Sequence, residues 1–136
     1  MRVVAFAPAL STQDDAGGGI VAQGFPMTAF YVDGFPGQIT VPMVISFVTL
    51  GGTDYDPVAF IVATSPEGQR VGSLQFGWHW PDNPPTPVKF RVFTQYLPMR
   101  VESPGIYTIG LYDSFDAEFS DVLFPLPVLK SNPLLG

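Results

Sequence analysis

The segment VPMVISFVTL, residues 41–50, predicts a β-strand that is apolar on both of its faces. Successive side chains of a strand point to opposite faces, so odd and even positions form two separate sets. One face would carry Val41, Met43, Ile45 and Phe47, and the opposite face Val44, Val48 and Leu50. An antiparallel strand with one face in water normally alternates apolar and polar residues. We therefore expect both faces of this strand to be covered, one by the core and one by something other than solvent.

Further β-branched and aromatic runs lie on both sides of this segment, separated by turn residues. The 136-residue chain holds 15 prolines and 14 glycines, which favour short elements and leave little room for long helices. The runs cover residues 3–10, 20–32, 39–50, 58–64, 70–80, 88–96, 106–113 and 122–129. They predict an all-β protein, a single-domain antiparallel β-sandwich of about eight strands with immunoglobulin-like or related Greek-key topology. The domain would span residues 1–129, and residues 130–136 would form an extended or disordered tail.

Three connections between these runs can be assigned from their turn chemistry. SPEGQR, residues 65–70, places proline and then glycine between two runs, as a tight hairpin turn requires. The runs on its two sides are therefore expected to be antiparallel neighbours. ESPGIY, residues 102–107, repeats this pattern and joins the strand that contains Phe90 to the one that contains Ile109. DDAGGGI, residues 14–20, is expected to be a flexible, acidic first turn.

The composition excludes several classes of protein. Six basic and twelve acidic residues give a net charge of −6, which disfavours nucleic acid as a partner. The absence of cysteine excludes thiolate catalysis, cysteine-ligated zinc and disulfides. The sequence has no run of about 18 apolar residues, so no membrane span is expected. Pro8 interrupts the short apolar run at the N-terminus, which favours a first strand over a signal peptide and predicts a cytoplasmic or virion-associated protein.

The surface is expected to be unusually apolar. Only 13% of the residues are charged, against about 25% in a typical soluble domain. VAFIVAT, residues 58–64, is a second two-sided strand, whereas VKFRVFT, residues 88–94, predicts an ordinary strand with Phe90 inward and Lys89 in water. Large apolar patches mark association surfaces, so we expect contact with another copy or another protein subunit. The predicted interface residues are Val44, Val48, Ile61 and Trp80; the alternative is that the 33–38 connection or the C-terminal tail covers them within one chain.

The stretch FGWHWPDNPPTP, residues 76–87, holds both tryptophans and the only histidine. On a strand, Trp78 and Trp80 share one face and His79 points to the other. The two indoles would form either a core ladder or a ligand-binding platform for a carbohydrate or another flat solute, with His79 beside it. As a catalytic base, His79 would need a nucleophile and an orienting carboxylate that the sequence does not identify. We therefore assign no catalytic residue and expect a non-enzymatic protein.

Acidic residues gather in two predicted loops. They are Asp113, Asp116, Glu118 and Asp121 in residues 112–121, and Asp54 and Asp56 in residues 53–56. Loop carboxylates at one end of a β-sandwich can bind calcium, but the spacing lacks the pattern of a dedicated calcium loop. Solvated turns are the preferred interpretation, and no metal or cofactor is assigned. A small hydrolase that combines loop carboxylates with His79 is disfavoured, because a domain of this size rarely builds the large cleft such a site needs.

The turn and strand patterns also resemble those of a known family. In chain order they are DDAGGGIVAQGFPMTAFY, VPMVISFVTL, SPEGQRV, SPGIYTIGLYD and FPLPV. Together they resemble a family of uncharacterised bacterial and phage β-sandwich proteins, a domain of unknown function, over nearly the whole chain. The resemblance implies an immunoglobulin-like or related sandwich and brings no catalytic residues. The leading expectation is thus a structural or interaction module that self-associates or belongs to a bacterial or phage assembly.

Overall fold

The computed structural model describes residues 1–51, 56–80, 87–113 and 120–131, and these residues form ten β-strands and no helix. The strands are β1 (Arg2–Pro8), β2 (Ser11–Asp14), β3 (Ile20–Gln23), β4 (Phe30–Val32), β5 (Gly37–Leu50), β6 (Val58–Thr64), β7 (Arg70–Gly77), β8 (Val88–Val101), β9 (Gly105–Tyr112) and β10 (Leu123–Lys130). The prediction of an all-β protein is confirmed. The strand number exceeds the expected eight because β2 is an additional strand and because the run 20–32 divides into β3 and β4. Gly24, with a φ of 61°, and Pro26 interrupt the extended backbone between them.

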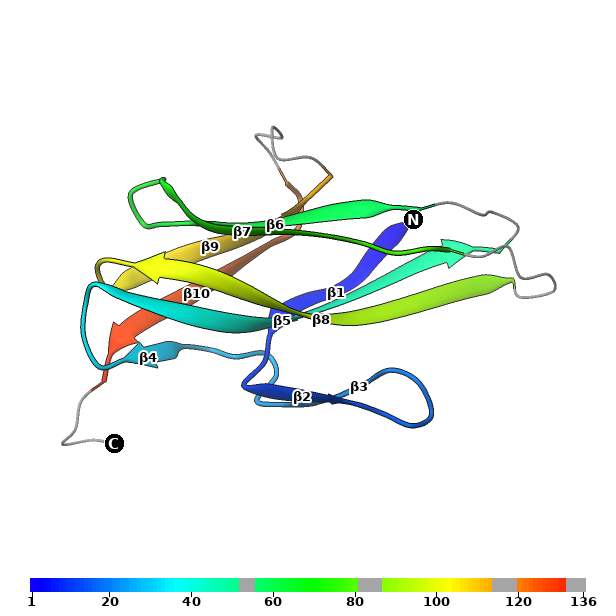
Figure 1. Cartoon of the computed structure of the whole chain (residues 1–136), viewed down its shortest axis with the longest axis horizontal. Helices are drawn as coiled ribbons and strands as arrows, with labels where there is room; N and C mark the ends of the chain where they lie inside the picture. The colour runs from blue at the N-terminus through cyan, green and yellow to red at the C-terminus, as the bar shows by residue number, and fades with distance from the viewer. Residues whose placement is uncertain (52–55, 81–86, 114–119, 132–136) are drawn as a thin grey trace.

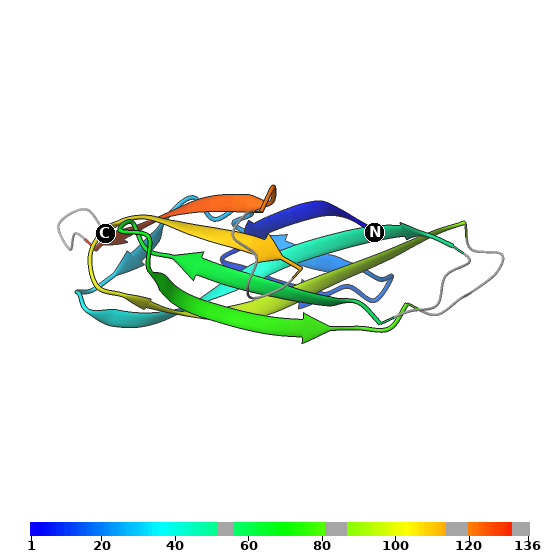
Figure 2. The ribbon, with the colours of Figure 1, turned by 90° about the horizontal axis from the view of Figure 1, so that it is seen from above.

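The strands form three sheets (Figures 1 and 2). A three-stranded sheet has the order β1-β5-β8, and a five-stranded, curled sheet has the order β4-β10-β9-β6-β7. The remaining strands, β2 and β3, form a separate hairpin. The recorded strand pairs are antiparallel except β4 with β10, which is parallel. The predicted purely antiparallel arrangement is therefore wrong at this edge, where a short strand from the first third of the chain lies beside the C-terminal strand.

The ladder between β5 and β8 determines which side chains enter the core. The two strands have 14 residues each and pair along their whole length, from Gly37 opposite Val101 to Leu50 opposite Val88. Because the side-chain period is two, a continuous ladder gives each strand one inward set of positions. The buried inward residues are Val41, Met43, Ile45 and Phe47 of β5 and Leu97, Met99 and Val101 of β8. The inward face predicted for residues 41–50 is thus confirmed.

The two larger sheets share one hydrophobic core. The five-stranded sheet contributes Ala59, Ile61, Ala63, Tyr107, Ile109, Leu111, Leu126 and Val128. Ile61 is completely buried, so the prediction that it faces outward is wrong. Both sets of alternate positions in β6 are apolar, and it is the set containing Ile61 that faces the core. The pairing of β6 with β7 and β9 on its two sides places this strand in the interior of the sheet.

The first half of β8 faces the opposite way from the prediction. Phe90 is 66% exposed, whereas Lys89 is buried. The continuous ladder with β5 explains this orientation, because it holds each side chain of β8 to one face along the whole strand. Residues 97, 99 and 101 are buried, so every odd residue of β8 points to the inner side. The aliphatic stem of Lys89 is covered, and its amine lies 5.8 Å from the centre of the Trp80 ring. This orientation places the ring of Phe90 on the outer face of the sheet.

The two sheets approach each other closely where β7 passes β8. A Cβ atom on Gly72 would lie 2.1 Å from the carbonyl oxygen of Pro98 and 3.2 Å from the Cα atom of Met99. These distances are too short for any side chain, so glycine is required at this position. The close approach closes one side of the shared core.

Two of the predicted turns join strands that pair with each other, and the third joins strands of different sheets. At residues 65–70 the amide of Ser65 donates to the carbonyl of Gln69, Gly68 adopts a φ of 90°, and β6 and β7 pair antiparallel, so the predicted hairpin is confirmed. Residues 14–20 likewise join the antiparallel strands β2 and β3. The turn near residues 102–105 joins β8 and β9, which lie in different sheets. It therefore links the two layers and does not form a paired hairpin.

The C-terminal strand ends near the predicted domain boundary. β10 runs to Lys130, and the amide of Ser131 donates to the carbonyl of Val32, which ties this end to β4. Most of the predicted tail, residues 132–136, lies outside the described residues. A search of the described residues for a helix long and apolar enough to cross a membrane found none.

Candidate functional site

The two tryptophans of the predicted ligand platform lie inside the protein. Trp78 and Trp80 are 8% and 1% exposed. Trp78 stacks on Phe47 with ring centroids 4.6 Å apart and meets Trp80 edge to face at 6.1 Å. Phe76 and Phe93 also pack on Trp78. This arrangement matches the core-ladder alternative and leaves no tryptophan face open for stacking on a sugar ring.

Burial removes the N–H groups of the two indoles from water, and no hydrogen bond within the described residues replaces those to water. Both Nε1 atoms are buried, and neither has a hydrogen-bond acceptor in the described part of the chain. A buried donor without an acceptor costs about 1–3 kcal/mol. The large rings of Trp78 and Trp80 therefore stabilise the fold by packing and not by hydrogen bonding.

His79 points away from the tryptophans, as the alternation predicts, and has an acidic neighbour. Its Nδ1 atom lies 2.6 Å from Oδ1 of Asp56, and both side chains are more than half exposed. Asp56 is thus the carboxylate that could orient His79, a role that sequence reasoning missed because the two residues are 23 positions apart. Exposed pairs of this kind contribute about 0–1 kcal/mol. The geometry is that of a surface contact rather than an enclosed acid–base pair.

The predicted calcium ligands are divided between described and undescribed parts of the chain. Asp56, Asp113 and Asp121 are described, whereas Asp54, Asp116 and Glu118 lie outside the described residues. Within residues 1–51, 56–80, 87–113 and 120–131 there is no group of three or more acidic or histidine side chains that could hold a metal ion. Calcium binding thus gains no support from this structure.

The four predicted interface residues have different environments. Ile61 and Trp80 lie in the core, and Val44 is buried on the outer face of the three-stranded sheet. Val48 is half-buried on the same outer face. The expectation of exposed side chains is therefore wrong for Ile61, Trp80 and Val44, and of the four only Val48 is accessible.

The cover over Val44 is the β2–β3 hairpin of the same chain. Thr94, the ladder partner of Val44 on β8, donates a hydrogen bond of 2.9 Å from its hydroxyl to the hydroxyl oxygen of Thr12 on β2. The hairpin therefore lies across the middle of the outer face, and Figure 1 shows it as a separate ribbon beside the larger sheets. Self-coverage was one of the expected alternatives, but this hairpin was not among the covering segments that the sequence suggested.

Beyond the hairpin, apolar side chains on the outer face remain uncovered. We call this group the outer strip and define it as Val48, Leu50, Val88 and Phe90. Leu50 pairs with Val88 and Val48 pairs with Phe90, so the four form two adjacent rows on one face. Leu50 is 73% exposed and Phe90 66%. A contiguous exposed group of this kind marks a contact surface, whereas single exposed apolar residues do not.

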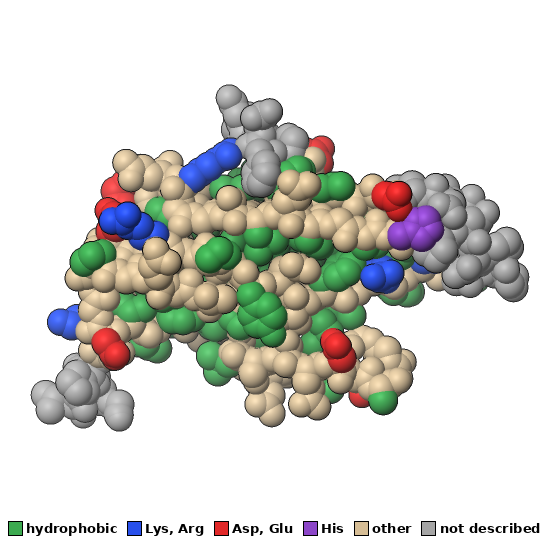
Figure 3. All heavy atoms as spheres, in the orientation of Figure 1, with side chains coloured by type: hydrophobic (Ala, Val, Ile, Leu, Met, Phe, Trp, Pro, Cys, Tyr) green, Lys and Arg blue, Asp and Glu red, His purple; other side chains and the backbone are tan. Residues whose placement is uncertain are grey.

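The distribution of charge leaves much of the molecular surface apolar. Figure 3 shows hydrophobic side chains over the middle of the molecule, whereas most charged side chains lie towards its two ends.

The ring of Phe90 projects between two surface hollows. The first, of about 530 Å³, lies between the hairpin tip and the sheet and is lined by Gly18, Gly19, Ile20, Ser46, Phe90, Arg91 and Val92. The second, of about 560 Å³, is lined by Met1, Arg2, Val48, Thr49, Leu50 and Val88. In the ladder, the row of Val48 and Phe90 separates the row of Ser46 and Val92 from that of Leu50 and Val88. The strip therefore combines an exposed ring with a surface hollow on either side.

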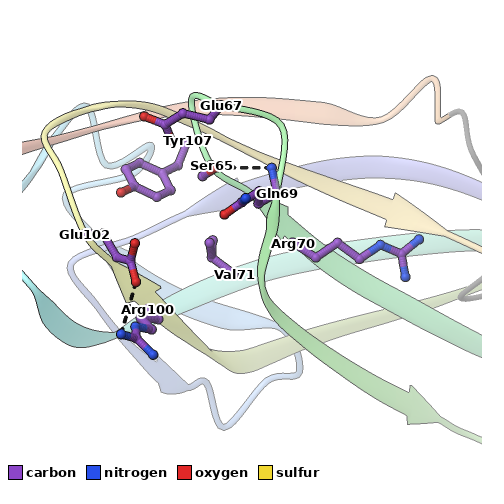
Figure 4. Close-up of a pocket in the computed structure, with 8 residues that line it drawn as sticks. All are labelled: Ser65, Glu67, Gln69, Arg70, Val71, Arg100, Glu102 and Tyr107. Carbon is purple, nitrogen blue, oxygen red and sulfur yellow. Dashed lines mark hydrogen bonds and ion pairs between the residues drawn. The ribbon is translucent and has the colours of Figure 1, made fainter.

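A polar recess of about 230 Å³ lies at the other end of β8 (Figure 4). Its lining residues are Ser65, Glu67, Gln69, Arg70, Val71, Arg100, Glu102 and Tyr107. Arg100 and Glu102 form an ion pair of 3.0 Å, and the amide of Gln69 donates to the hydroxyl of Ser65. The buried Tyr107 donates its hydroxyl hydrogen to the carbonyl of Ser103 at 2.8 Å. Because many of its polar groups bond to one another, this recess stabilises the two turns and is a weaker candidate than the outer strip.

Comparisons with known proteins add no assignment: no protein-family model matches the chain, and a search of curated proteins gave no significant match. The outer strip is the candidate functional site on the basis of its geometry alone.

Proposed function

We propose that the protein is a non-enzymatic interaction module that binds a protein subunit through the outer strip. The observation that carries the proposal is the exposure of Leu50 and Phe90 in adjacent rows of one face, beside the hairpin that contacts the middle of that face. Burial of each large apolar side chain contributes about 1.5–3 kcal/mol before the costs of association are subtracted. A few such side chains are enough for a specific contact of moderate strength.

We further propose that the two larger sheets form a sandwich related to the immunoglobulin-like class, as the resemblance to uncharacterised bacterial and phage proteins implies. Two features support this proposal: the shared core, and the bond from Tyr107 to a carbonyl four residues upstream. Immunoglobulin domains contain a comparable tyrosine corner. The parallel β4–β10 pair and the curl of the five-stranded sheet depart from the simplest form of that fold. The expected setting is an accessory subunit of a bacterial or phage assembly.

The alternative functions have less support. A carbohydrate platform at Trp78 and Trp80 would require exposed ring faces, and both rings are buried. A hydrolase would use His79 and Asp56, which lie in contact but in an exposed position that gives little electrostatic advantage.

The proposal is tested by measuring the mass of the protein, both purified and in extracts of its source cells, by size-exclusion chromatography with light scattering. The wild type is compared with a Leu50→Ser/Phe90→Ser double variant and with Ile106→Ser, which alters an exposed residue of β9 outside the strip. We expect the wild type and the control to elute in an associated form in at least one preparation, and the double variant as a monomer. A wild type that is monomeric in both preparations, or an association that the double variant retains, would contradict the proposal.

A further inference from the structure

We infer that the partner bound by the outer strip is a second copy of this chain, in a dimer with two-fold symmetry. The inference rests on the proposed function and identifies its partner. A two-fold interface uses the same surface on both subunits, so that surface must be complementary to itself. The shape, the charge and the size of the outer strip each bear on this requirement.

The shape of the strip supplies a projection and a matching depression. Phe90 projects from the sheet, and one row further along the ladder lies the hollow lined by Met1, Val48, Leu50 and Val88. In a two-fold arrangement, Phe90 of each copy enters this hollow on the other. Each ring then contacts aliphatic side chains of the other copy, and the apolar rows that solvent contacts in the single chain become covered.

The charges around the strip are arranged in a complementary way. Arg2, which pairs with Val48 across the β1–β5 ladder, lines the hollow on one side of the Phe90 row. Asp14 and Asp15 precede the glycines of the hairpin tip on the other side, where Arg91 is the one basic residue among the described residues that line the hollow. Two copies with a net charge of −6 each repel one another overall. A cation and an acidic tip at opposite borders of the same surface reduce this repulsion and help to orient the second copy.

The size of the surface predicts a weak dimer. An aromatic side chain buries about 150–250 Å² at most, and standard interfaces bury about 800 Å² per partner. The four strip residues, two of which are less than half exposed, cover less than this area. We therefore expect reversible dimerisation in the micromolar range, with a monomer in dilute solution.

Sedimentation velocity of the purified protein over a wide concentration range tests this inference. The wild type should show a reversible monomer–dimer equilibrium. Phe90→Ser should weaken dimerisation about 100-fold, because the ring is lost twice per dimer and each 1.4 kcal/mol corresponds to a tenfold change. Ile106→Ser should leave the equilibrium unchanged, and Arg2→Glu should weaken dimerisation several-fold at low salt. A wild type that stays monomeric at every concentration, or a dimer that Phe90→Ser leaves intact, would overturn the inference.

Cross-linking tests the arrangement of the two copies, since the chain has no cysteine and single introduced thiols report one contact each. A mixture of Phe90→Cys and Leu50→Cys proteins should form disulfide-linked heterodimers under mild oxidation, and a mixture of Phe90→Cys and Ile106→Cys should not. Equal cross-linking in the two mixtures would contradict the two-fold arrangement.

Binding of an anilinonaphthalene sulfonate dye, which reports exposed apolar surface, separates failure of the inference from failure of the proposed function. If the wild type is monomeric when purified but associated in extracts and binds the dye, and Phe90→Ser removes that binding, the strip remains a contact surface for a different subunit and only the second-copy inference fails. If the wild type is monomeric and Phe90→Ser leaves dye binding unchanged, both fail.

Discussion

The inner and outer faces of the three-stranded sheet are both rich in apolar residues, yet their environments differ. On the inner face, Val41, Ile45 and Phe47 pack against the other sheet and the tryptophans. On the outer face, Val44 lies under the β2–β3 hairpin, and Leu50 and Phe90 are exposed. The apolar character of a strand face therefore does not determine its burial. Burial depends on which other segment of the chain packs on that face.

The largest expected contrast is between two phenylalanines on opposite faces of this sheet. Phe47→Ala should lower the free energy of unfolding by about 3–5 kcal/mol, because it leaves a cavity beside Trp78. Phe90→Ala should change it by no more than about 0.5 kcal/mol at a protein concentration where the chain is monomeric. Urea unfolding followed by circular dichroism measures both values. Equal losses for the two variants would show that the faces do not differ as described.

The next largest effect is expected at Gly72, where β7 passes close to β8 and closes one side of the core. Gly72→Ala should lower the free energy of unfolding by about 2–3 kcal/mol, because the added methyl group meets the backbone of Pro98. Gly34→Ala is the matched control, since an added Cβ there meets no atom within 4 Å. The same unfolding experiment measures both. A tolerated Gly72→Ala would indicate that β7 and β8 are further apart than the structure has them.

The smallest effect concerns the hairpin that covers the middle of the outer face. Thr12→Val removes the acceptor of the Thr94 hydroxyl and should weaken the docking of the hairpin by about 0.5–1.5 kcal/mol. Amide hydrogen exchange of β2 and β3 should become about two- to tenfold faster, while exchange in β6 should stay unchanged. Gln13→Ala, at an exposed position of the same strand, is the control. If exchange in β2 and β3 is unaffected, the hairpin does not depend on this contact.

Much of the strand and turn pattern could be predicted from local sequence chemistry. Proline and glycine in residues 65–70 identify the β6–β7 turn, and the apolar run of residues 41–50 identifies a strand with one face in the core. The covering hairpin could not be predicted in this way. Its contact joins Thr12 to Thr94, two polar residues 82 positions apart, and no local pattern encodes that pairing.

The orientation of β8 shows why the candidate site was missed. Within residues 88–94 the even positions are the more apolar, so a short window places Phe90 inside and Lys89 outside. Extension of the window to residues 96–101 adds Leu97, Met99 and Val101, all odd, and this was the available signal. A long strand keeps one orientation throughout, so its more strongly buried half determines the direction of the other. The position of Phe90 is thus set by residues up to eleven positions away.

The central claim is that Phe90 faces solvent in the single chain and becomes covered when copies associate. The rate at which a thiol reagent modifies a trace amount of Phe90→Cys, measured against the concentration of added wild-type protein, tests it most directly, with Leu97→Cys as the buried comparison on the same strand. The wild type keeps its own Phe90 ring and has no thiol that could react. We predict that Phe90→Cys reacts fast without added wild type and more slowly as the wild-type concentration rises, and that Leu97→Cys reacts slowly throughout. A Phe90→Cys thiol as protected as Leu97→Cys when no wild type is added, or one that reacts equally fast at every wild-type concentration, would contradict the claim.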